Sequence, residues 1–529
     1  MKNIFKTIAL AGIVSLTSTS CEEFLGDNVN PNQATSATPE LVLPNALVST
    51  ASNLRNVNTN AMWINGYTVN AGGYGGWGSV VTYNYTTSSY AGVWTGLYDD
   101  LVNYKYIETA SEGDPLLVYS NAIAKIMMAY DYHMLVDVFG DIPYTEALQG
   151  SANVIPKYDS QAAVYQDLVA KLNTAIDLIE GGEGANAIGA GDVMFGGDMH
   201  AWAQFANTLK LRLLIRMAEA SETSAFAAAE FASFDTDLGF ITDDAMVNPG
   251  YIATDGKQNP YWNTYHTNAA GALAGSGRSA IPSIYVYSFY DGSKILDQGR
   301  GYATYRGYPA TTPKGQLGNL DDNPAALASQ TAWYVGSGTG TSATNTIGLL
   351  KGRTAGVPLI LAAEAYFLQA EAYMKGYLSG DDSEAFNAGI LASYQYLYED
   401  INGATSADWD PETDFDLYLN DNDNNYLVHY ELATTPAQKL EAIITQKYIA
   451  YNFINAQETW SEFRRTGYPK IVNGSSDPRA TFASILSSSS RPDELPVRYL
   501  YSNIEFQLNG ANVPTGMNQF TSLIFWQAQ

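Results

Sequence analysis

The stretch AAEAYFLQAEAYMKG, residues 362–376, is the segment that decides the fold. Its apolar side chains recur every three or four residues, which is typical of an amphipathic helix. Alanines on the same face allow a neighbouring helix to approach closely, and Gly376 ends the segment. This combination is typical of tetratricopeptide-type helix pairs, although a strict repeat of about 34 residues is absent. The apolar positions are Leu359, Ala363, Tyr366, Ala370 and Tyr373.

Four other segments show the same helical period over about four turns, and each predicts a helix with one buried face. We interpret these stripes as core positions. They are Ile123, Ile126, Tyr130, Met134 and Val138; Val164, Leu168, Leu172, Ala175 and Ile179; Trp202, Phe205, Leu209, Leu213 and Met217; and Leu440, Ile444, Tyr448, Tyr451 and Ile454.

Two long stretches, 65–98 and 250–352, lack any period and are rich in Gly, Ser, Thr, Asn and aromatic residues. Loops of this length are uncommon in compact proteins and are usually functional. Short strands are expected at Ser283–Phe289. No linker divides residues 41–529. The sequence therefore predicts one mainly α domain, a helical scaffold that carries long irregular aromatic loops and a few short strands.

The N-terminus has the pattern of a secretory leader, with two lysines before the short apolar run 8–16. Such a run is too short to span a membrane, which takes about 20 residues. Cys21 is the only cysteine and follows directly. We expect 1–20 to be a lipoprotein signal peptide, Cys21 to carry lipid, and 21–40 to be a tether. The alternative is an ordinary signal peptide with an incidental thiol, since Ser18 departs from the usual Leu.

The composition is strongly acidic, with 54 acidic and 27 basic residues and a net charge of −27. Without residues 1–20, which hold two lysines and no acid, the net charge is −29. This balance excludes nucleic acid as a principal partner. The chain also has 38 tyrosines against 19 phenylalanines. Tyrosine offers a ring face and a hydroxyl, so this ratio suits a wet recognition surface as well as a loop-rich protein.

The order of several motifs resembles the SusD/RagB family of outer-membrane nutrient-binding lipoproteins of Bacteroidetes. Beyond the leader, the resemblance lies in EEFLGDNVNPNQAT (22–35), PELVLPNAL (39–47), DVFGDIPYTEAL (137–148), LILAAEAYFLQAEAYMKG (359–376), QETWSEFRRTGYPKI (457–471) and LPVRYLYSNIEFQLN (495–509). Glu22 and Glu23 resemble the family's signal for export to the cell surface. The resemblance implies about four tetratricopeptide-like helix pairs, irregular loops and a few short strands that build a ligand face, and a SusC-like TonB-dependent transporter over which the lipoprotein closes as a lid.

The resemblance implies capture of a nutrient at the cell surface and its delivery to that transporter, without catalysis, and the aromatic, Gly- and Tyr-rich loops favour oligosaccharides as that nutrient. An oligopeptide-binding lid of a RagAB-like importer is the alternative, and a surface adhesin or structural lipoprotein is a more distant one. An enzyme finds little support: the four histidines are far apart, no His-Glu-x-x-His or G-x-S-x-G motif occurs, and the lone cysteine is expected to carry lipid.

Sugars are recognised by aromatic rings that cover their apolar faces and by a few polar groups that bind their hydroxyls. Aromatic residues within the two loop regions are therefore the candidate ligand-binding positions, although loop aromatics also pack beneath their own loops. The candidates are Tyr74, Trp77, Tyr83, Tyr85, Trp262, Tyr265, Tyr305, Trp333 and Tyr334. Trp94 is interpreted as a core residue. Arg464 and Arg465, with Trp460 in ETWSEFRRTGYP, are interpreted as structural ion-pair formers rather than ligand-binding groups.

No cofactor is expected, and a structural calcium ion is only a weak possibility at NDNDNN, residues 420–425. Asp421, Asp423 and Asn425 have the alternate spacing of a calcium loop. Tyr426 stands where an EF-hand needs glycine, and Leu432 where it needs glutamate, so a solvated turn fits better. The glycines of GSGTG (336–340) lack the following helix that a phosphate site requires.

Overall fold

The computed structural model describes residues 37–325, 333–335, 347–405 and 408–527. The longer helices are α3 (Pro39–Ile64), α5 (Ala91–Ser111), α6 (Val118–Phe139), α7 (Gln161–Glu180), α8 (Met199–Met217), α14 (Ala362–Met374), α15 (Asp382–Tyr398), α16 (Pro411–Asp421), α17 (Pro436–Ala450) and α18 (Ala456–Thr466). The shorter ones are α4 (Ser79–Thr82), α9 (Ser224–Ala232), α10 (Pro260–Tyr265), α11 (Gly275–Ser279), α12 (Ile284–Tyr287), α13 (Gln298–Thr304) and α19 (Asn503–Leu508).

The strands are short and form three antiparallel pairs. These are β1 (Thr68–Asn70) with β5 (Ala280–Pro282), β2 (Ile142–Pro143) with β3 (Tyr158–Asp159), and β4 (Ala245–Val247) with β6 (Val357–Ile360). The predicted mainly α fold is confirmed.

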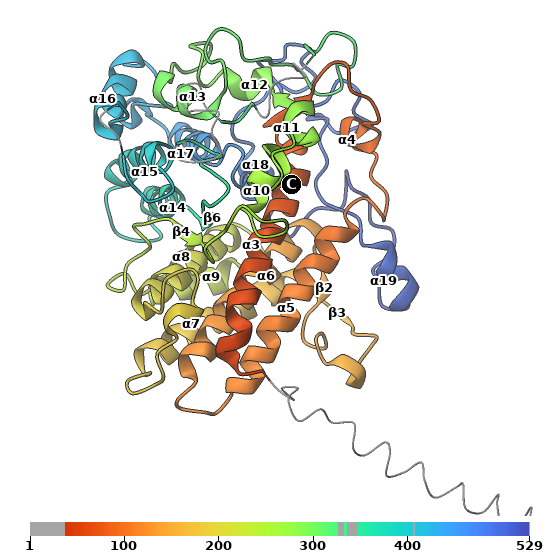
Figure 1. The fold of residues 1–529 in the computed structure, drawn as a ribbon, viewed down its shortest axis with the longest axis vertical. Helices are drawn as coiled ribbons and strands as arrows, with labels where there is room; N and C mark the ends of the chain where they lie inside the picture. The colour runs from red at the N-terminus through yellow and green to blue at the C-terminus, as the bar shows by residue number, and fades with distance from the viewer. Residues whose placement is uncertain (1–36, 326–332, 336–346, 406–407, 528–529) are drawn as a thin grey trace, which may run out of the picture.

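Successive long helices pack as pairs, α5 with α6, α7 with α8, α14 with α15, and α17 with α18. Helix α3 runs lengthwise through the molecule and packs against both α5 and α18 (Figure 1). Its Asn58 donates to the carbonyl of Phe453 at 2.7 Å and accepts from the backbone N–H of Ala456 at 2.7 Å. The first described helix and the last helix pair are therefore joined by direct hydrogen bonds.

The close approach of α14 and α15 has a simple steric cause. A Cβ atom added to Gly389 of α15 would lie 2.6 Å from Cε1 of Phe367 on α14, closer than real atoms allow. Buried alanines such as Ala363 and Ala370 line the α14 side. The small residues that indicated helix pairing in the sequence therefore lie at a helix–helix contact.

The N-terminus of helix α17 is determined by its local sequence. Thr435 and Gln438 form a capping box, in which each side chain binds the other's backbone N–H, and Pro436 occupies the first helical position. A capping box satisfies N–H groups that have no partner within the helix, and proline suits the first turn because it lacks an N–H.

A network of buried charges joins five helices of the scaffold. Arg212 on α8 makes a bidentate contact with Glu364 on α14, at 2.9 and 2.6 Å. Arg216, also on α8, contacts Asp137 of α6 at 2.5 Å and Glu458 of α18 at 2.6 Å. Each of these ions has its charge compensated inside the protein, as burial requires.

Lys447 of α17 and Arg465 of α18 extend this network. Lys447 lies 3.0 Å from Glu364, 2.9 Å from Glu458 and 3.1 Å from Glu462. Arg465 contacts Glu371 on α14 at 2.6 Å and Glu462 at 2.5 Å. Burial alone would raise the pKa of Glu458, yet Arg212, Arg216 and Lys447 hold that pKa well below its usual value. The carboxylate is thus charged when the protein is folded.

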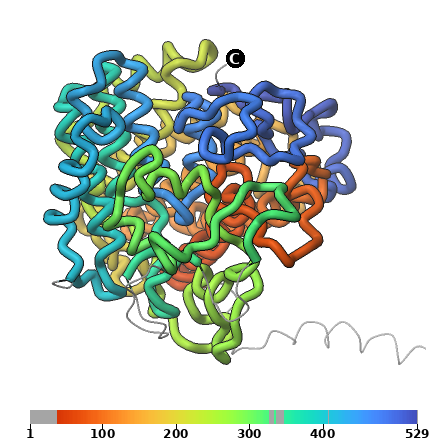
Figure 2. Tube along the Cα trace, turned by 90° about the horizontal axis from the view of Figure 1, so that it is seen from above, coloured from red at the N-terminus to blue at the C-terminus, as the bar shows by residue number. Residues whose placement is uncertain are grey.

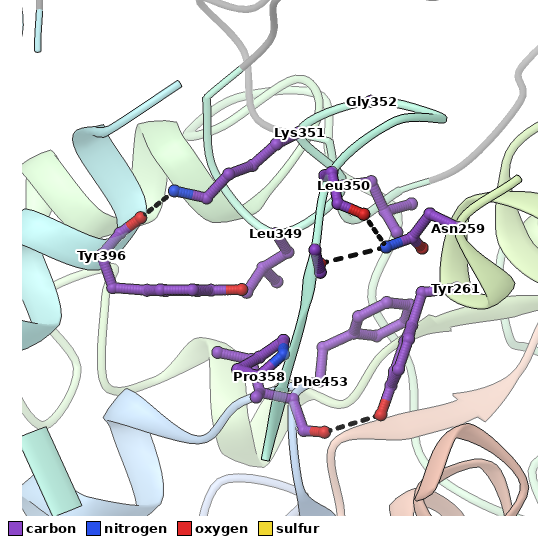
Figure 3. Close-up of a pocket in the computed structure, with 12 residues that line it drawn as sticks. Asn259, Tyr261, Leu349, Leu350, Lys351, Gly352, Pro358, Tyr396 and Phe453 are labelled. Carbon is purple, nitrogen blue, oxygen red and sulfur yellow. Dashed lines mark hydrogen bonds between the residues drawn. The ribbon is translucent and has the colours of Figure 1, made fainter. Parts of the chain in front are cut away.

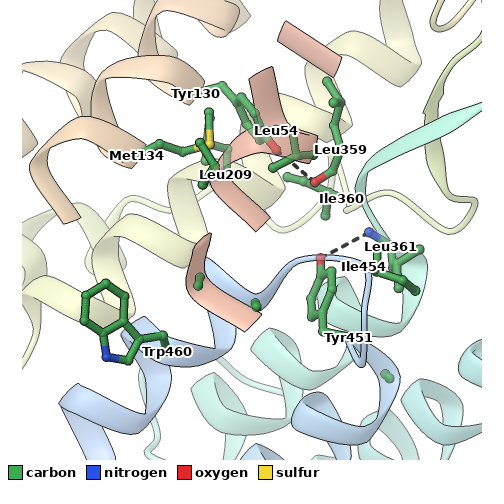
Figure 4. Packing of buried hydrophobic residues seen from close by; sticks show 14 of the residues in the cluster. Leu54, Tyr130, Met134, Leu209, Leu359, Ile360, Leu361, Tyr451, Ile454 and Trp460 are labelled. Atoms are coloured by element: carbon green, nitrogen blue, oxygen red, sulfur yellow. Dashed lines mark hydrogen bonds between the residues drawn. The ribbon is translucent and has the colours of Figure 1, made fainter. Parts of the chain in front are cut away.

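The apolar core lies beside this network, between α3, α6, α8, β6 and the segment that joins α17 to α18 (Figure 4). The Tyr130 hydroxyl donates to the carbonyl of Leu359 at 3.0 Å, and the N–H of Leu361 donates to the Tyr451 hydroxyl at 3.3 Å. Tyrosines therefore fill the core and also satisfy backbone groups at the end of β6.

The two aromatic loop regions meet at β1 and β5, and Figure 2 shows the red and green segments side by side. Asn323 donates from Nδ2 to the carbonyl of Asn70 at 2.6 Å, and the N–H of Gly72 donates to the carbonyl of Pro324 at 3.0 Å. A Cβ atom at Gly72 would lie 2.1 Å from the Asn323 carbonyl oxygen, so this approach requires glycine.

Several sequence expectations need correction. The strand expected at Ser283–Phe289 is the short helix α12, because the Ser283 side chain accepts from the N–H of Val286 and caps a helical turn, and the strand β5 lies just before it. Leu359 belongs to β6 rather than to the following helix. The loop regions also contain helices, since α5 begins at Ala91 and α10 to α13 lie within 250–352.

Trp94 is a core residue and Arg465 forms ion pairs, as predicted, whereas Arg464 binds backbone carbonyls instead of carboxylates. Trp94 is 3% exposed in the core. Arg465 forms ion pairs, as described above. Arg464 forms no ion pair within the described residues; it donates to the carbonyls of Asp137 and Val497 at 2.7 and 2.8 Å and lies 3.9 Å from the ring centroid of Trp460. Its role is structural through carbonyls and a cation–π contact.

Candidate functional site

A pair of half-buried tryptophans marks the first loop region. Trp63, near the end of α3, and Trp77, in the glycine-rich loop, have ring centroids 5.2 Å apart at an interplanar angle of 50°. Trp77 donates from Nε1 to the carbonyl of Tyr74 at 3.1 Å, which fixes the loop locally. Tyr74 is also half-buried. These three side chains combine accessible aromatic surface with a held geometry, as a sugar platform requires.

Glycines on both sides of Trp77 expose this aromatic surface. Gly76 and Gly78 both have positive φ angles, of 83° and 46°, and no heavy atom lies near the Cβ position of either. Because the two residues that flank Trp77 carry no side chain, they do not obstruct a flat ligand that approaches its ring. Trp63 was not among the sequence candidates; its only signal is its position in the last turn of a helix directly before a glycine-rich loop.

The other predicted aromatic residues lie in the core. The seven are Tyr83, Tyr85, Trp262, Tyr265, Tyr305, Trp333 and Tyr334, each at most 5% exposed. In this conformation they hold the loops in place, and their role in ligand contact stays a prediction. Of the nine candidates, Tyr74 and Trp77 are the two with accessible ring surface.

Hydrogen bonds satisfy the polar atoms of several of these buried aromatic side chains. The Tyr334 hydroxyl donates to the carbonyl of Tyr67 at 2.9 Å, and its ring stacks on Phe453 at 4.3 Å. Trp262 donates from Nε1 to the Thr267 hydroxyl at 3.0 Å. A buried phenol or indole with a partner supplies apolar area without an unsatisfied polar atom. The buried aromatic side chains of the two loop regions thus form an apolar core that packs these loops.

A narrow cavity lies where α10, β6 and α15 meet (Figure 3). Asn259 donates to the carbonyls of Ala355 and Gly356 at 2.8 and 3.1 Å, and the Tyr261 hydroxyl donates to the carbonyl of Ile454 at 3.0 Å. The cavity volume is about 20 Å³, which is space for about one water molecule. These side chains hold loop to scaffold and leave no room for a sugar.

A larger cavity of about 270 Å³ lies on the other side of Lys351. Burial lowers the pKa of Lys351 to about 8, while its ammonium donates to the carbonyls of Tyr396 and Glu399. Burial also raises the pKa of Asp244 to about 7. This cavity suits water or a small polar group; Tyr396 supplies its only ring wall among the described residues.

The weak calcium candidates do not converge in the described part of the chain. Asn425 uses its amide to donate to the carbonyl of Lys294 at 2.8 Å and its oxygen to accept from the N–H of Leu427. Asp423 accepts from Asn424 at 2.6 Å. The described residues contain no group of three or more His, Cys, Asp or Glu side chains that could hold a metal ion. Calcium binding at Asp421, Asp423 and Asn425 stays a prediction. The GSGTG glycines lie outside the described residues.

Helix pairs that carry a loop-built aromatic face define a class of binding proteins. Two family models match consecutive parts of the sequence: one described as "Starch-binding associating with outer membrane" matches residues 31–272, and one described as "Susd and RagB outer membrane lipoprotein" matches residues 342–520. The chain belongs to the SusD/RagB family. Proteins of this family are binding proteins and outer-membrane lipoproteins. No curated protein sequence matches the chain.

Solved structures share the fold over nearly the whole length. A SusD homologue from Parabacteroides distasonis has a TM-score of 0.70 and 21% identity, covering 93% of this chain and 98% of its own. A SusD/RagB family protein from Bacteroides thetaiotaomicron has a TM-score of 0.67 and 18% identity, covering 93% and 100%. A chitin-binding SusD homologue from Flavobacterium johnsoniae has a TM-score of 0.65 and 22% identity, covering 91% and 98%.

The predicted lipid attachment point, Cys21, lies outside the described residues, as do the predicted leader 1–20 and most of the tether 21–40. Within the part that is described, none of the helices has the length and apolar character needed to cross a membrane.

Proposed function

We propose that this protein captures oligosaccharides at the cell surface and delivers them to a SusC-like, TonB-dependent transporter, over which it acts as a lid anchored through Cys21. The observation that carries the proposal is the Trp63–Trp77 pair beside Tyr74. Aromatic faces with few polar groups suit the apolar faces of sugar rings. The chitin-binding relative supports a glycan as the ligand class.

Isothermal titration of the soluble body against neutral oligosaccharides and oligopeptides tests the ligand class. Heat from glycans that is lost in Trp63→Ala and Trp77→Ala supports the proposal. Phe506→Ala is a matched control, because Phe506 on α19 is an aromatic residue that is 43% exposed and makes no ring contact with Trp63, Tyr74 or Trp77. Binding of peptides alone would mean that the ligand is an oligopeptide rather than a glycan. Unchanged glycan affinity in both tryptophan variants would show that the glycan does not bind at Trp63 and Trp77.

The anchor and the partner are tested in cells. Cys21→Ala is expected to release the protein from the membrane while the released protein keeps its glycan affinity. Wild-type protein is expected to co-purify with a large barrel protein from detergent-solubilised outer membranes. Membrane retention of the Cys21→Ala variant would contradict lipid anchoring through Cys21. Purification of the wild-type protein without any barrel protein would contradict its role as the lid of a transporter.

A further inference from the structure

A third and larger cavity lies between α13, α15 and α16, on elements that carry none of Trp63, Tyr74 or Trp77. Its volume is about 410 Å³, within the range of about 300–1,000 Å³ that is typical of small-molecule sites. Trp409 and Tyr302 line it and are half-buried, so each offers part of a ring face. Other lining residues include Tyr394 and Tyr418, whose buried rings form part of the wall.

The ring walls are held by aromatic contacts with residues outside the cavity. Trp409 packs edge-to-face on Tyr398, with ring centroids 5.0 Å apart. Tyr302 packs in the same way on Tyr308, also at 5.0 Å. A site whose walls are fixed before a ligand arrives loses less conformational entropy on binding.

The polar groups of this cavity are acidic. Asp408, Asp414 and Asp421 line it with Gln298, and none of its described lining residues is basic. The nearest positive charge behind the ring walls, Arg300, is fully buried and compensated by Asp297 at 2.6 Å. Arg300 lies 4.8 Å from the Tyr394 ring centroid and 5.0 Å from that of Tyr418, on the rings that form the wall. The cavity thus presents three carboxylates that have no cationic partner among its lining residues.

Asp414 is fixed in this arrangement. Its Oδ2 atom accepts a hydrogen bond from the Tyr398 hydroxyl, and a Cβ atom on Gly299 would lie 3.1 Å from the same oxygen. Asp408 and Asp421 are exposed at the rim. One carboxylate is therefore placed at the wall and two at the entrance.

We propose that this cavity is a second ligand site, selective for a saccharide that carries a free ammonium group. Aromatic faces attract both sugar rings and cations, and carboxylates add charge-assisted hydrogen bonds to an ammonium. The exposed Gln298 is available to the sugar hydroxyls. The site does not depend on the Trp63–Trp77 platform, because neither tryptophan lines this cavity.

The test is titration of a glucosamine tetramer and an N-acetylglucosamine tetramer into the Trp77→Ala variant, in which the first site is removed. We expect the amine form to bind about tenfold more tightly, because an ammonium gains cation–π and carboxylate contacts that an acetamide lacks. Trp409→Ala should weaken both tetramers, and Asp408→Asn with Asp421→Asn should abolish the preference.

The matched control is Asp416→Asn with Asp423→Asn, which removes the same charge from exposed positions that do not line the cavity. This variant should keep the tenfold preference. Equal affinity for the two tetramers, a preference lost in the control, or a lysine tripeptide that binds as tightly as the amine tetramer would overturn the proposal. Because Trp77 is absent throughout, failure of the proposed function does not affect this result.

Discussion

Two regions of the molecule bury polar side chains by different chemistry. Among α6, α8, α14, α17 and α18, full charges are neutralised by one another, as in the contact of Lys447 with Glu364, Glu458 and Glu462. In the loop regions the buried polar atoms are mostly neutral, and tyrosine hydroxyls meet backbone carbonyls, as Tyr334 meets Tyr67. Removal of one partner is therefore expected to destabilise the helix region strongly, because it leaves a buried charge uncompensated. Loss of one neutral hydrogen bond in the loop regions is expected to reduce stability much less.

The largest effect is expected in the charge network. Glu458→Ala should lower the free energy of unfolding by about 3–5 kcal/mol, because Arg216 and Lys447 would keep buried charge without this partner. Chemical denaturation measures the change. Glu222→Ala is the control, since Glu222 is exposed. A loss below about 1 kcal/mol would show that the network is not the main polar support of the scaffold.

A buried acid outside the network gives the next largest effect, and it depends on pH. Burial raises the pKa of Asp100 to about 6, only partly offset by the hydrogen bond from Asn53. The folded pKa exceeds that of the unfolded chain, so this group costs stability above pH 6, and the cost is relieved as pH falls toward about 4.

Asp100→Asn should therefore be more stable than wild type at pH 8, by at most about 3 kcal/mol, and nearly equal to it at pH 4. Denaturation at both pH values measures the difference. A variant that is less stable at pH 8 would mean that the ionised carboxylate is stabilised by its surroundings.

A smaller effect is expected for one hydroxyl in the loop region. Tyr334→Phe should cost about 1 kcal/mol, because the Tyr67 carbonyl loses its shorter hydrogen bond and keeps only the longer one from the N–H of Ser283, at 3.4 Å. Tyr251→Phe is the matched control, since the buried Tyr251 hydroxyl has no hydrogen-bond partner among the described residues. Thermal unfolding should separate the two variants; equal changes would indicate that the hydroxyl–carbonyl bonds do not support the loops.

A further effect on stability is expected at the platform. Trp77→Ala should lower the free energy of unfolding by less than the about 3–5 kcal/mol that is typical of a fully buried tryptophan, because the Trp77 ring is only partly buried. Glycan affinity measured on the same samples should fall by tenfold or more. A large stability loss would place Trp77 with the structural aromatics of the second loop region.

The scaffold could be predicted because helical periodicity reports burial directly. The stripes at 123–138, 164–179 and 202–217 lie within α6, α7 and α8. Helix α3 was missed because Pro44 and several asparagines obscure its period. For α12 the sequence pattern predicts a strand, since IYVY has the β-branched and aromatic residues of a strand, while the cap at Ser283 starts a helical turn.

The candidate site was less predictable because composition does not report exposure. Tyr74 and Trp77 have the same loop setting in the sequence as Tyr83 and Tyr85, yet the first two are half-buried and the others are in the core. What separates them is tertiary packing: Tyr85 lies against Tyr90 at 4.8 Å and near Tyr499 at 6.5 Å, a residue more than 400 positions later. Trp409 and Asp414 likewise form a cavity only once α13 and α15 are in place.

The hydrogen bonds that join Asn58 to Phe453 and Ala456 can form only late in synthesis, after the ribosome has made residues 453 and 456. At about 5–20 residues per second, nearly 400 residues of synthesis separate α3 from its partners by about 20–80 s. During that interval the part of α3 that packs against α18 has no permanent cover, although α5 is made soon after α3 and can already pack against it. Holding factors that bind nascent chains should therefore have their longest contact with residues 39–64, and a ribosome stalled before residue 450 should display this segment to a protease.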